Sequence, residues 1–330
     1  MNFISSQKLG IQKDHSFSII ILLMIAFTYS LFVGSGFYGF GNDYYGAYVK
    51  GFKWNSPRAG LFDYLGYKIS TFRIGGLYFG VYLVTFIIST CTGFLIREHF
   101  KFKGIKSLIL FLIIFLIAIH TWPVVMSTSN AMRQGLAMSF IFLVLIFSSR
   151  KNYYWMISFS IIAALMHKSG PLIISIILFA TILNEILNSF PKKRKIIINF
   201  FIGIFLLCLS YFILNVFILP DQEPTRIING DFRAAFVLIS LIYVTLSFFY
   251  RKILDNSFNL SLYYFSFISL APLMIGLNWE YERLGMTMLI PYILSFGILL
   301  NKSSYKIYLI LTFFLLFLLT IYTGMYTSLK

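Results

Sequence analysis

The chain has 330 residues, of which 59% are hydrophobic, 19% aromatic and only 12% charged, and its mean hydropathy is +0.84. A soluble domain of this length carries far more charge, so the composition excludes that class and indicates a protein that crosses a membrane many times. The net charge of +16 does not indicate nucleic-acid binding, because the basic residues stand in small groups between hydrophobic runs. Membrane topology and anionic lipid headgroups account for that distribution.

The hydrophobic runs predict about eleven membrane-spanning helices, and therefore an all-α polytopic membrane protein. The first run, 17–37, is longer than the hydrophobic part of a usual signal peptide, so we interpret it as an uncleaved first helix. The further runs are 74–96, 107–122, 131–147, 153–166, 171–187, 196–219, 234–250, 260–277, 284–300 and 305–323. We find no internal repeat, and we expect one integral membrane domain over 1–330.

The basic residues of the short loops predict the orientation, with the N-terminus in the cytoplasm and the C-terminus outside. In that orientation the cytoplasmic segments hold 16 of the 27 lysine and arginine residues. They are Lys8, Lys13, Arg97, Lys101, Lys103, Lys106, Arg150, Lys151, Lys192, Lys193, Arg194, Lys195, Arg251, Lys252, Lys302 and Lys306. The two longest polar segments, 38–73 and 220–233, then form loops at the outer face, and a site there would open away from the cytoplasm.

The first candidate site residues begin the run 131–147. On a helix that starts near Asn130, residues Asn130, Arg133 and Gln134 share one face with the small Ala137. A guanidinium offers a fixed fork of donors that matches phosphate or carboxylate oxygens. The alternative is an interfacial arginine that extends toward lipid headgroups. We favour the functional interpretation, because two amide side chains accompany the arginine and an ion within the membrane is costly.

A second candidate group, His167 and Lys168, lies where one predicted helix ends and the next begins at Gly170 and Pro171. The histidine is suited to act as a base, to donate to a phosphate, or to satisfy the turn. Further candidates at the predicted outer face are Asp43, Arg233, Glu280, Glu282 and Arg283. Glu280 and Arg283 are three residues apart and form a natural ion pair, which leaves Glu282 as the freer carboxylate.

The sequence lacks the signatures of several enzyme classes. It contains no P-loop, no HExxH and no GxSxG motif, which are the signatures of P-loop NTPases, zinc proteases and serine hydrolases. We see no carboxylate cluster of the metal-binding type and neither Cys91 nor Cys208 lies in a metal-binding spacing, so we predict no metal and no cofactor.

The segment Arg133-Gln134-Gly135-Leu136-Ala137, followed one helical hairpin later by Met166-His167-Lys168-Ser169, resembles the EpsG family of bacterial membrane proteins. That family is related to the Wzy-type polymerases of O antigen and capsule. Asp43-Tyr44 after the first helix and Glu282-Arg283 before a late helix are similar to the other polar positions of the family.

The resemblance implies a helical bundle of the GT-C-like kind in the bacterial cytoplasmic (inner) membrane, and a glycosyltransferase without a cofactor. It would move a growing glycan from undecaprenyl diphosphate onto an incoming lipid-linked repeat unit, for O antigen, capsule or exopolysaccharide. Arg133 would hold the diphosphate, helped by Arg283, Lys168 or Arg233. His167 would contact the diphosphate or the acceptor, and Glu282 or Asp43 would be the base. Gln134, Asn130 and Glu280 would line the sugar site.

Other functions fit parts of the sequence. A flippase for lipid-linked sugars should present polar groups to both faces and often has two related halves. A membrane glycan acyltransferase would need a cytoplasmic cluster for its acyl donor, and we find none. A purely structural role would tolerate replacement of Arg133 and His167. We expect lipid-linked glycans and membrane lipid as partners, with a repeat-unit flippase and a chain-length regulator as further candidates, and no nucleic acid.

Overall fold

A computed structural model describes residues 3–37, 39–40, 72–99, 105–129, 131–167, 169–218, 234–249, 254–274 and 278–302, and the single positions 307, 310, 311 and 314. In these residues the chain is helical apart from one short hairpin. It divides into two compact units. Unit 1 comprises Met1–Leu143, Leu165–His167 and Phe296–Lys330, and unit 2 comprises Val144–Ala164 and Lys168–Ser295.

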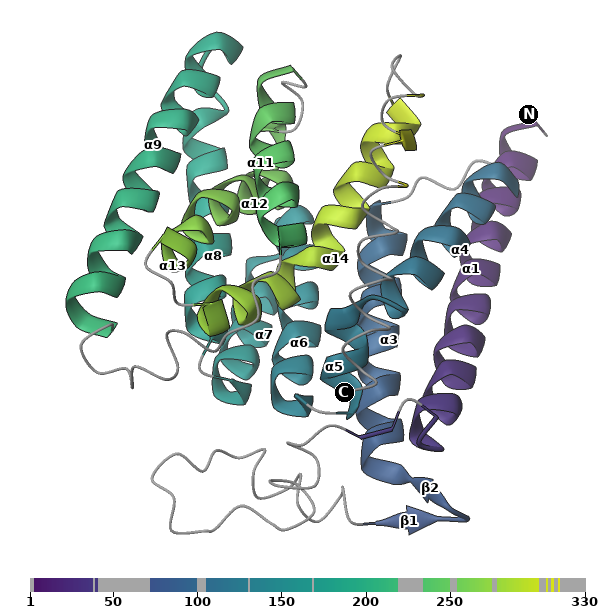
Figure 1. Ribbon diagram of the computed structural model, residues 1–330. Coiled ribbons are helices and arrows are strands. Elements are labelled where there is room, and N and C mark those ends of the chain that lie inside the picture. Colours follow the sequence, from purple (N-terminus) through teal and green to yellow (C-terminus); the bar gives the residue numbers. More distant parts are fainter. Residues whose placement is uncertain are drawn as a thin grey trace. The chain divides into compact units, whose positions relative to one another are not determined.

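Unit 1 is built around helix α3 (Phe79–His99), which packs along α1 (Phe3–Gly34) and also contacts α4 (Ile105–Ile119) and α5 (Trp122–Ser129). Figure 1 shows α1 and α3 running side by side. Their approach depends on small residues, because a Cβ added at Gly93 would lie 2.7 Å from the side chain of Leu22. Glycine at such a contact lets two apolar helices come close in lipid.

The predicted helix 74–96 begins later than expected, at Phe79, because a hairpin precedes it. Strands β1 (Arg73–Ile74) and β2 (Leu77–Tyr78) pair antiparallel, with Arg73 opposite Tyr78. The turn is Gly75-Gly76, with φ angles of +54° and +83°, which is the left-handed backbone of the tightest hairpin turns. The guanidinium of Arg73 lies 4.3 Å from the centre of the Tyr78 ring.

The predicted helix 107–122 is broken. The chain bends by 56° between Ser107–Ile119 and Trp122–Thr128, and this interrupts the helix at His120 and Thr121. Pro123 has no N–H and restricts the residue before it, so an uninterrupted helix is unfavourable here. The freed carbonyl of Ile119 accepts a hydrogen bond of 2.7 Å from the Tyr29 hydroxyl, as a break inside a membrane requires.

Unit 2 surrounds a short helix that is buried on every side. Helix α12 (Ser257–Ile268) has all of its residues buried and contacts α8 (Gly170–Leu187), α9 (Lys192–Ile213) and α11 (Ala234–Phe249). The other elements that lie wholly or largely in this unit are α7 (Tyr153–Met166), the π-helix η2 (Leu214–Ile218), α13 (Leu270–Met274) and α14 (Asn278–Lys302). The predicted span 260–277 was therefore wrong as one continuous helix, since it ends at Ile268 and a new helix begins at Leu270.

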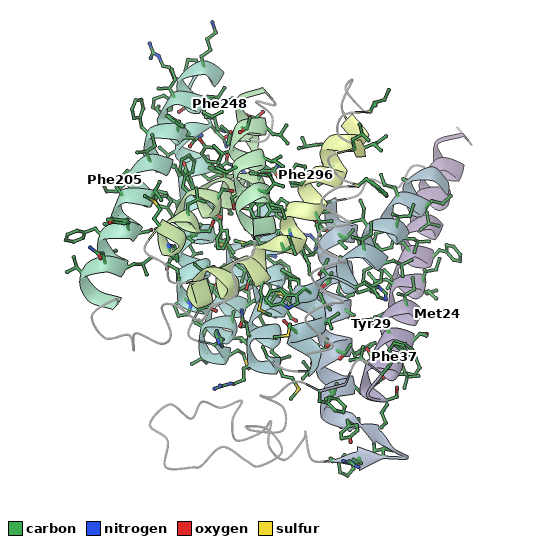
Figure 2. The ribbon with its side chains drawn as sticks, viewed as in Figure 1. Met24, Tyr29, Phe37, Phe205, Phe248 and Phe296 are labelled. Carbon is green, nitrogen blue, oxygen red and sulfur yellow. The ribbon has the colours of Figure 1, made fainter. Side chains whose placement is uncertain are left out.

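The chain is a multi-pass membrane protein. Among the described residues five helices are long and apolar enough to cross a membrane, or six if the bent pair counts as one span. Helix α9 is the most exposed of these helices, with only 11% of its apolar stretch buried. Figure 2 shows side chains such as Phe205 projecting from it. Helix α6 (Met132–Ser149) and helices α7, α8 and α9 agree with the predicted runs. The number of eleven spans and the orientation stay predictions.

Candidate functional site

The candidate site begins with the first turn of α6, which carries Arg133 and Gln134. The chain turns from α5 into α6 through Ala131, whose N–H donates to the Met126 carbonyl over 2.7 Å. Gly135 makes the tight approach possible, because a Cβ there would lie 2.6 Å from Cβ of Ser127 and 2.9 Å from its carbonyl oxygen. The glycine of the Arg-Gln-Gly motif therefore lets the first turn of α6 lie close against Ser127 of α5.

The two polar side chains of this turn lie in different surroundings. Gln134 is buried, with only 5% of its surface exposed, while Arg133 is half-buried. Each of the two side chains makes at least one further interaction. The two side chains of the predicted polar face therefore differ in exposure, and their roles stay predictions.

His167 directly follows α7 and is half-exposed. Helix α8 begins three residues later at Gly170, where a Cβ would lie 2.5 Å from the carbonyl oxygen of Ala163. The turn is therefore too tight for any side chain at position 170. Ser169 precedes the helix without a capping side-chain hydrogen bond, and Pro171 lies in its first turn.

Arg133 and His167 fall in the same compact unit, although a long hairpin separates them in the sequence. The short segment Leu165–His167 groups with Met1–Leu143, while the residues on either side of it belong to unit 2. The pairing of the arginine and histidine motifs in one site stays a prediction.

The remaining predicted site residues are only partly described. Glu280, Glu282 and Arg283 lie within α14, so the expectation that Glu282 and Arg283 precede a late helix was wrong by about one turn. Asp43, Asn130, Lys168 and Arg233 lie outside the described residues. Their roles stay predictions.

The break between α4 and α5 is a feature that the sequence interpretation missed. His120 is exposed at this break, its Nδ1 lies 2.8 Å from the carbonyl of Leu116, and its ring meets Tyr29 at 5.2 Å between centres. Half-helices inside membrane proteins often border binding sites, because their ends bring backbone polar groups to mid-membrane depth. Pro123 in His-Thr-Trp-Pro was the available signal.

In the described part of the chain, no three His, Cys, Asp or Glu side chains lie close enough to hold a metal ion. The arrangement offers instead a cation, Arg133, near the start of a helix, where the backbone dipole also favours an anion. A half-exposed histidine belongs to the same unit. These groups suit the binding of phosphate oxygens and the transfer of a proton.

Comparison with known proteins adds one match. A family model described as EpsG family matches residues 20–329, which is nearly the whole chain. No curated protein matches, and no solved structure matches.

Proposed function

Because the chain belongs to the EpsG family, whose members are Wzy-type polysaccharide polymerases, we propose that it polymerises lipid-linked oligosaccharide repeat units at the outer face of the bacterial cytoplasmic membrane. The observation that carries this proposal is the family match over residues 20–329. The chain would then be a glycosyltransferase whose donor and acceptor are both undecaprenyl-diphosphate-linked glycans.

The proposed reaction makes one bond and breaks one. A hydroxyl oxygen of the acceptor sugar attacks the anomeric carbon of the donor, and the bond from that carbon to the diphosphate oxygen breaks. The hydroxyl proton goes to a base, and the electron pair of the broken bond stays on undecaprenyl diphosphate. The site must therefore hold the growing negative charge of the leaving group and accept a proton.

Arg133 is the proposed diphosphate ligand, because it is half-buried at the start of α6, where its charge and the helix dipole act together. His167 is proposed to contact the diphosphate or the acceptor, since it is half-exposed and lies in the same unit. Glu282 or Asp43 is the proposed base, with Arg283, Lys168 and Arg233 as further cations. Gln134 is proposed to hold the first turn of α6 in place from its buried position.

We also propose that the reaction needs no metal. The diphosphate is already a good leaving group, and arginine side chains can stabilise the charge it gains. Polymerisation should continue in a chelator of divalent cations. Loss of activity in the chelator, restored by magnesium, would contradict this part of the proposal.

A genetic experiment tests the function. The gene is deleted in its host and restored as wild type, Arg133→Ala or His167→Ala at matched membrane levels, and the surface glycan is resolved by length on a gel. We expect deletion to remove long chains while single repeat units persist, with rescue by wild type and not by either variant. An unchanged length distribution on deletion rules out the polymerase, and accumulation of unexported lipid-linked units identifies a flippase instead.

A further inference from the structure

Two basic turns of unit 2 meet at the same end of helix α8. The ammonium of Lys151, in the turn after α6, lies 2.8 Å from the carboxylate of Glu185. The ammonium of Lys195, in the first turns of α9, lies 3.3 Å from the Asn184 side-chain oxygen and 3.4 Å from that of Asn188. Because residues 184, 185 and 188 form the last turns of α8, the groups Arg150-Lys151 and Lys193-Arg194 flank one helix end.

The basic residues at the start of α9 do not favour the stability of that helix in the isolated chain. Helix α9 begins Lys192-Lys193-Arg194-Lys195 with no acidic residue in its first turn and no side-chain cap. Positive charge at a helix N-terminus opposes the backbone dipole and destabilises the helix. Lys195 is buried and meets Asp255 at 3.8 Å, whereas Lys193 and Arg194 are exposed, with no carboxylate within ion-pair distance among the described residues.

The backbone conformation at Lys151 is also unfavourable for a residue other than glycine. The turn after α6 closes with hydrogen bonds from Asn152 N–H to the Phe147 carbonyl and from Lys151 N–H to the Ser148 carbonyl. This pattern puts Lys151 at the position that glycine usually occupies, and its φ of 56° lies in the left-handed region. A lysine there is strained relative to glycine. The backbone at Lys151 is therefore unfavourable for a lysine, while its ammonium is paired with Glu185.

The surface below the charges is apolar and exposed. Residues 193, 197, 201 and 205 follow one another at four-residue intervals and therefore form a stripe along α9. Below Lys193 the stripe exposes Ile197 by 56%, Phe201 by 65% and Phe205 by 62%. From position 193 to 205 the helix rises about 18 Å, close to the thickness of one leaflet of hydrocarbon. In Figure 2 side chains tipped with nitrogen extend from the first turn of α9, with apolar side chains along the helix below them.

Exposed aromatic residues follow the basic turn after α6. Helix α7 begins with Tyr153, Tyr154 and Trp155, which are 44%, 73% and 47% exposed. Tyrosine and tryptophan gather where hydrocarbon meets the headgroups. The apolar stretches of α8 and α9 end and begin at this point, at Leu187 and Lys193. We therefore expect the cations to lie at the depth of lipid phosphates.

We propose that Lys193 and Arg194, together with Arg150 and Lys151, bind the phosphates of anionic phospholipids whose acyl chains lie along the exposed stripe of α9. The bound phosphates oppose the charge at the start of α9 and relieve its conflict with the helix dipole. Anionic phospholipid is thereby a specific stabilising ligand of unit 2, whatever the glycan substrate of the protein.

The test measures thermal unfolding of the full-length protein in detergent, with dioleoyl phosphatidylglycerol or dioleoyl phosphatidylcholine added at equal mole ratios. We expect phosphatidylglycerol to raise the melting temperature of the wild type more than phosphatidylcholine does. The variant Lys193→Gln/Arg194→Gln should lose most of that difference, yet melt at the same or a higher temperature in detergent alone. Lys151→Gly should behave in the same way with a smaller loss.

Binding should follow the same order. Each basic residue near an anionic surface contributes roughly a fivefold change in affinity, so the double variant should bind phosphatidylglycerol about 25-fold more weakly. Arg73→Gln is the matched control, because Arg73 is an exposed arginine of the β1–β2 hairpin in unit 1, and it should keep the wild-type response. A double variant that keeps the full phosphatidylglycerol response overturns the proposal. Equal stabilisation by the two lipids, or by inorganic phosphate alone, also overturns it.

Discussion

Units 1 and 2 hold their helices together by different means. In unit 1 the central helix α3 approaches its neighbours through small residues, as at Gly93 against Leu22. Buried hydroxyls there bond carbonyls of their own helix, such as Thr85 to Val81 at 2.7 Å and Ser139 to Gly135 at 2.9 Å. A hydroxyl that bonds within its own helix does not link two helices, so the close contacts at glycine contribute to the packing of this unit.

In unit 2 the buried helix α12 is linked to its neighbours by side-chain hydrogen bonds. The Tyr264 hydroxyl donates to the Asn199 side chain of α9 at 2.5 Å. Asn259 accepts from Ser295 of α14 at 3.2 Å, and Ser257 accepts from Ser148 of α6 at 2.9 Å. Polar side chains on a helix enclosed on all sides must find partners within the protein, and in α12 several of these partners lie on other helices. In unit 2 several interhelical side-chain hydrogen bonds gather on one buried helix, whereas in unit 1 those from Tyr29 to the Ile119 carbonyl and from Arg97 to Ser18 lie apart from each other.

We expect the largest effect on stability from a substitution at Gly135, in unit 1. Alanine is the better helix former, but its Cβ would press against Cβ and the carbonyl oxygen of Ser127, and a backbone oxygen cannot turn away. We expect Gly135→Ala to destabilise the protein by about 2 kcal/mol, measured by thermal unfolding in detergent.

Gly297→Ala is the matched control in the same unit. Its Cβ would meet Cδ1 of Ile114, the mobile end of a side chain that can change rotamer. We expect a neutral or stabilising effect there. Equal destabilisation by both substitutions would show that glycine proximity to backbone is not what joins the helices of unit 1.

The next effect concerns the polar links of unit 2. Tyr264→Phe removes the donor to Asn199, whose side-chain nitrogen is already buried without a hydrogen-bond partner among the described residues. Leaving that amide wholly unsatisfied should cost about 1.5 kcal/mol. Adding Asn199→Leu should recover part of the loss, since both polar groups are then gone. In unit 1, Thr85→Val should change stability little, and a loss as large as that of Tyr264→Phe would remove the distinction between the units.

A smaller effect is expected at the start of α12. The Asn256 side chain accepts a hydrogen bond of 2.7 Å from the backbone N–H of Asn259 and so caps the helix. Asn256→Ala should cost about 1 kcal/mol, whereas Asn256→Ser should preserve most of the stability because serine caps well. Chemical denaturation of the two variants in the same detergent distinguishes them. If alanine is tolerated as well as serine, the cap does not contribute to the stability of α12.

The smallest effect is expected at the exposed ion pair of Lys151 and Glu185. The hydrogen bond and the charge of Glu185 raise the pKa of the Lys151 ammonium. A lysine pKa that is raised in the folded state adds stability below its unfolded pKa, and this is lost as the pH rises through the folded value. Because both groups are largely exposed, Glu185→Gln should leave the melting temperature near neutral pH unchanged within error. A clear drop at neutral pH that disappears at alkaline pH would show that this surface pair supports unit 2 as well.

Much of the fold was predictable, because a hydrophobic run long enough to cross a membrane leaves few alternatives. The runs that became α6, α7, α8 and α9 were predicted to within a few residues. The hairpin of 73–78 was not, although Gly75-Gly76 was a visible turn signal, because two-residue strands leave no alternation to detect. The burial of α12 also escaped prediction, since a run such as 260–277 has the same hydropathy whether it faces lipid or protein.

The start of α6 at the candidate site was predictable from the sequence, whereas the roles of Arg133 and His167 stay predictions. The motif around Arg133 located the start of α6, and the turn at His167 came out in the same unit. Spacing alone could not tell that Gln134 is buried while its neighbour Arg133 is half-exposed, because that depends on how closely Gly135 lets α6 approach α5. Helical periodicity gives the faces of a helix but not which face a neighbour covers.

The central claim is that this chain alone lengthens a lipid-linked glycan, and one reconstitution tests it directly. The purified protein is placed in liposomes with lipid-linked repeat units extracted from the deletion strain, and product length and free undecaprenyl diphosphate are measured together. The account predicts longer glycans with one undecaprenyl diphosphate released for each unit added, and neither product with a folded Arg133→Ala variant. Wild-type protein that is folded and leaves single repeat units unchanged, with no diphosphate lipid released, would contradict it.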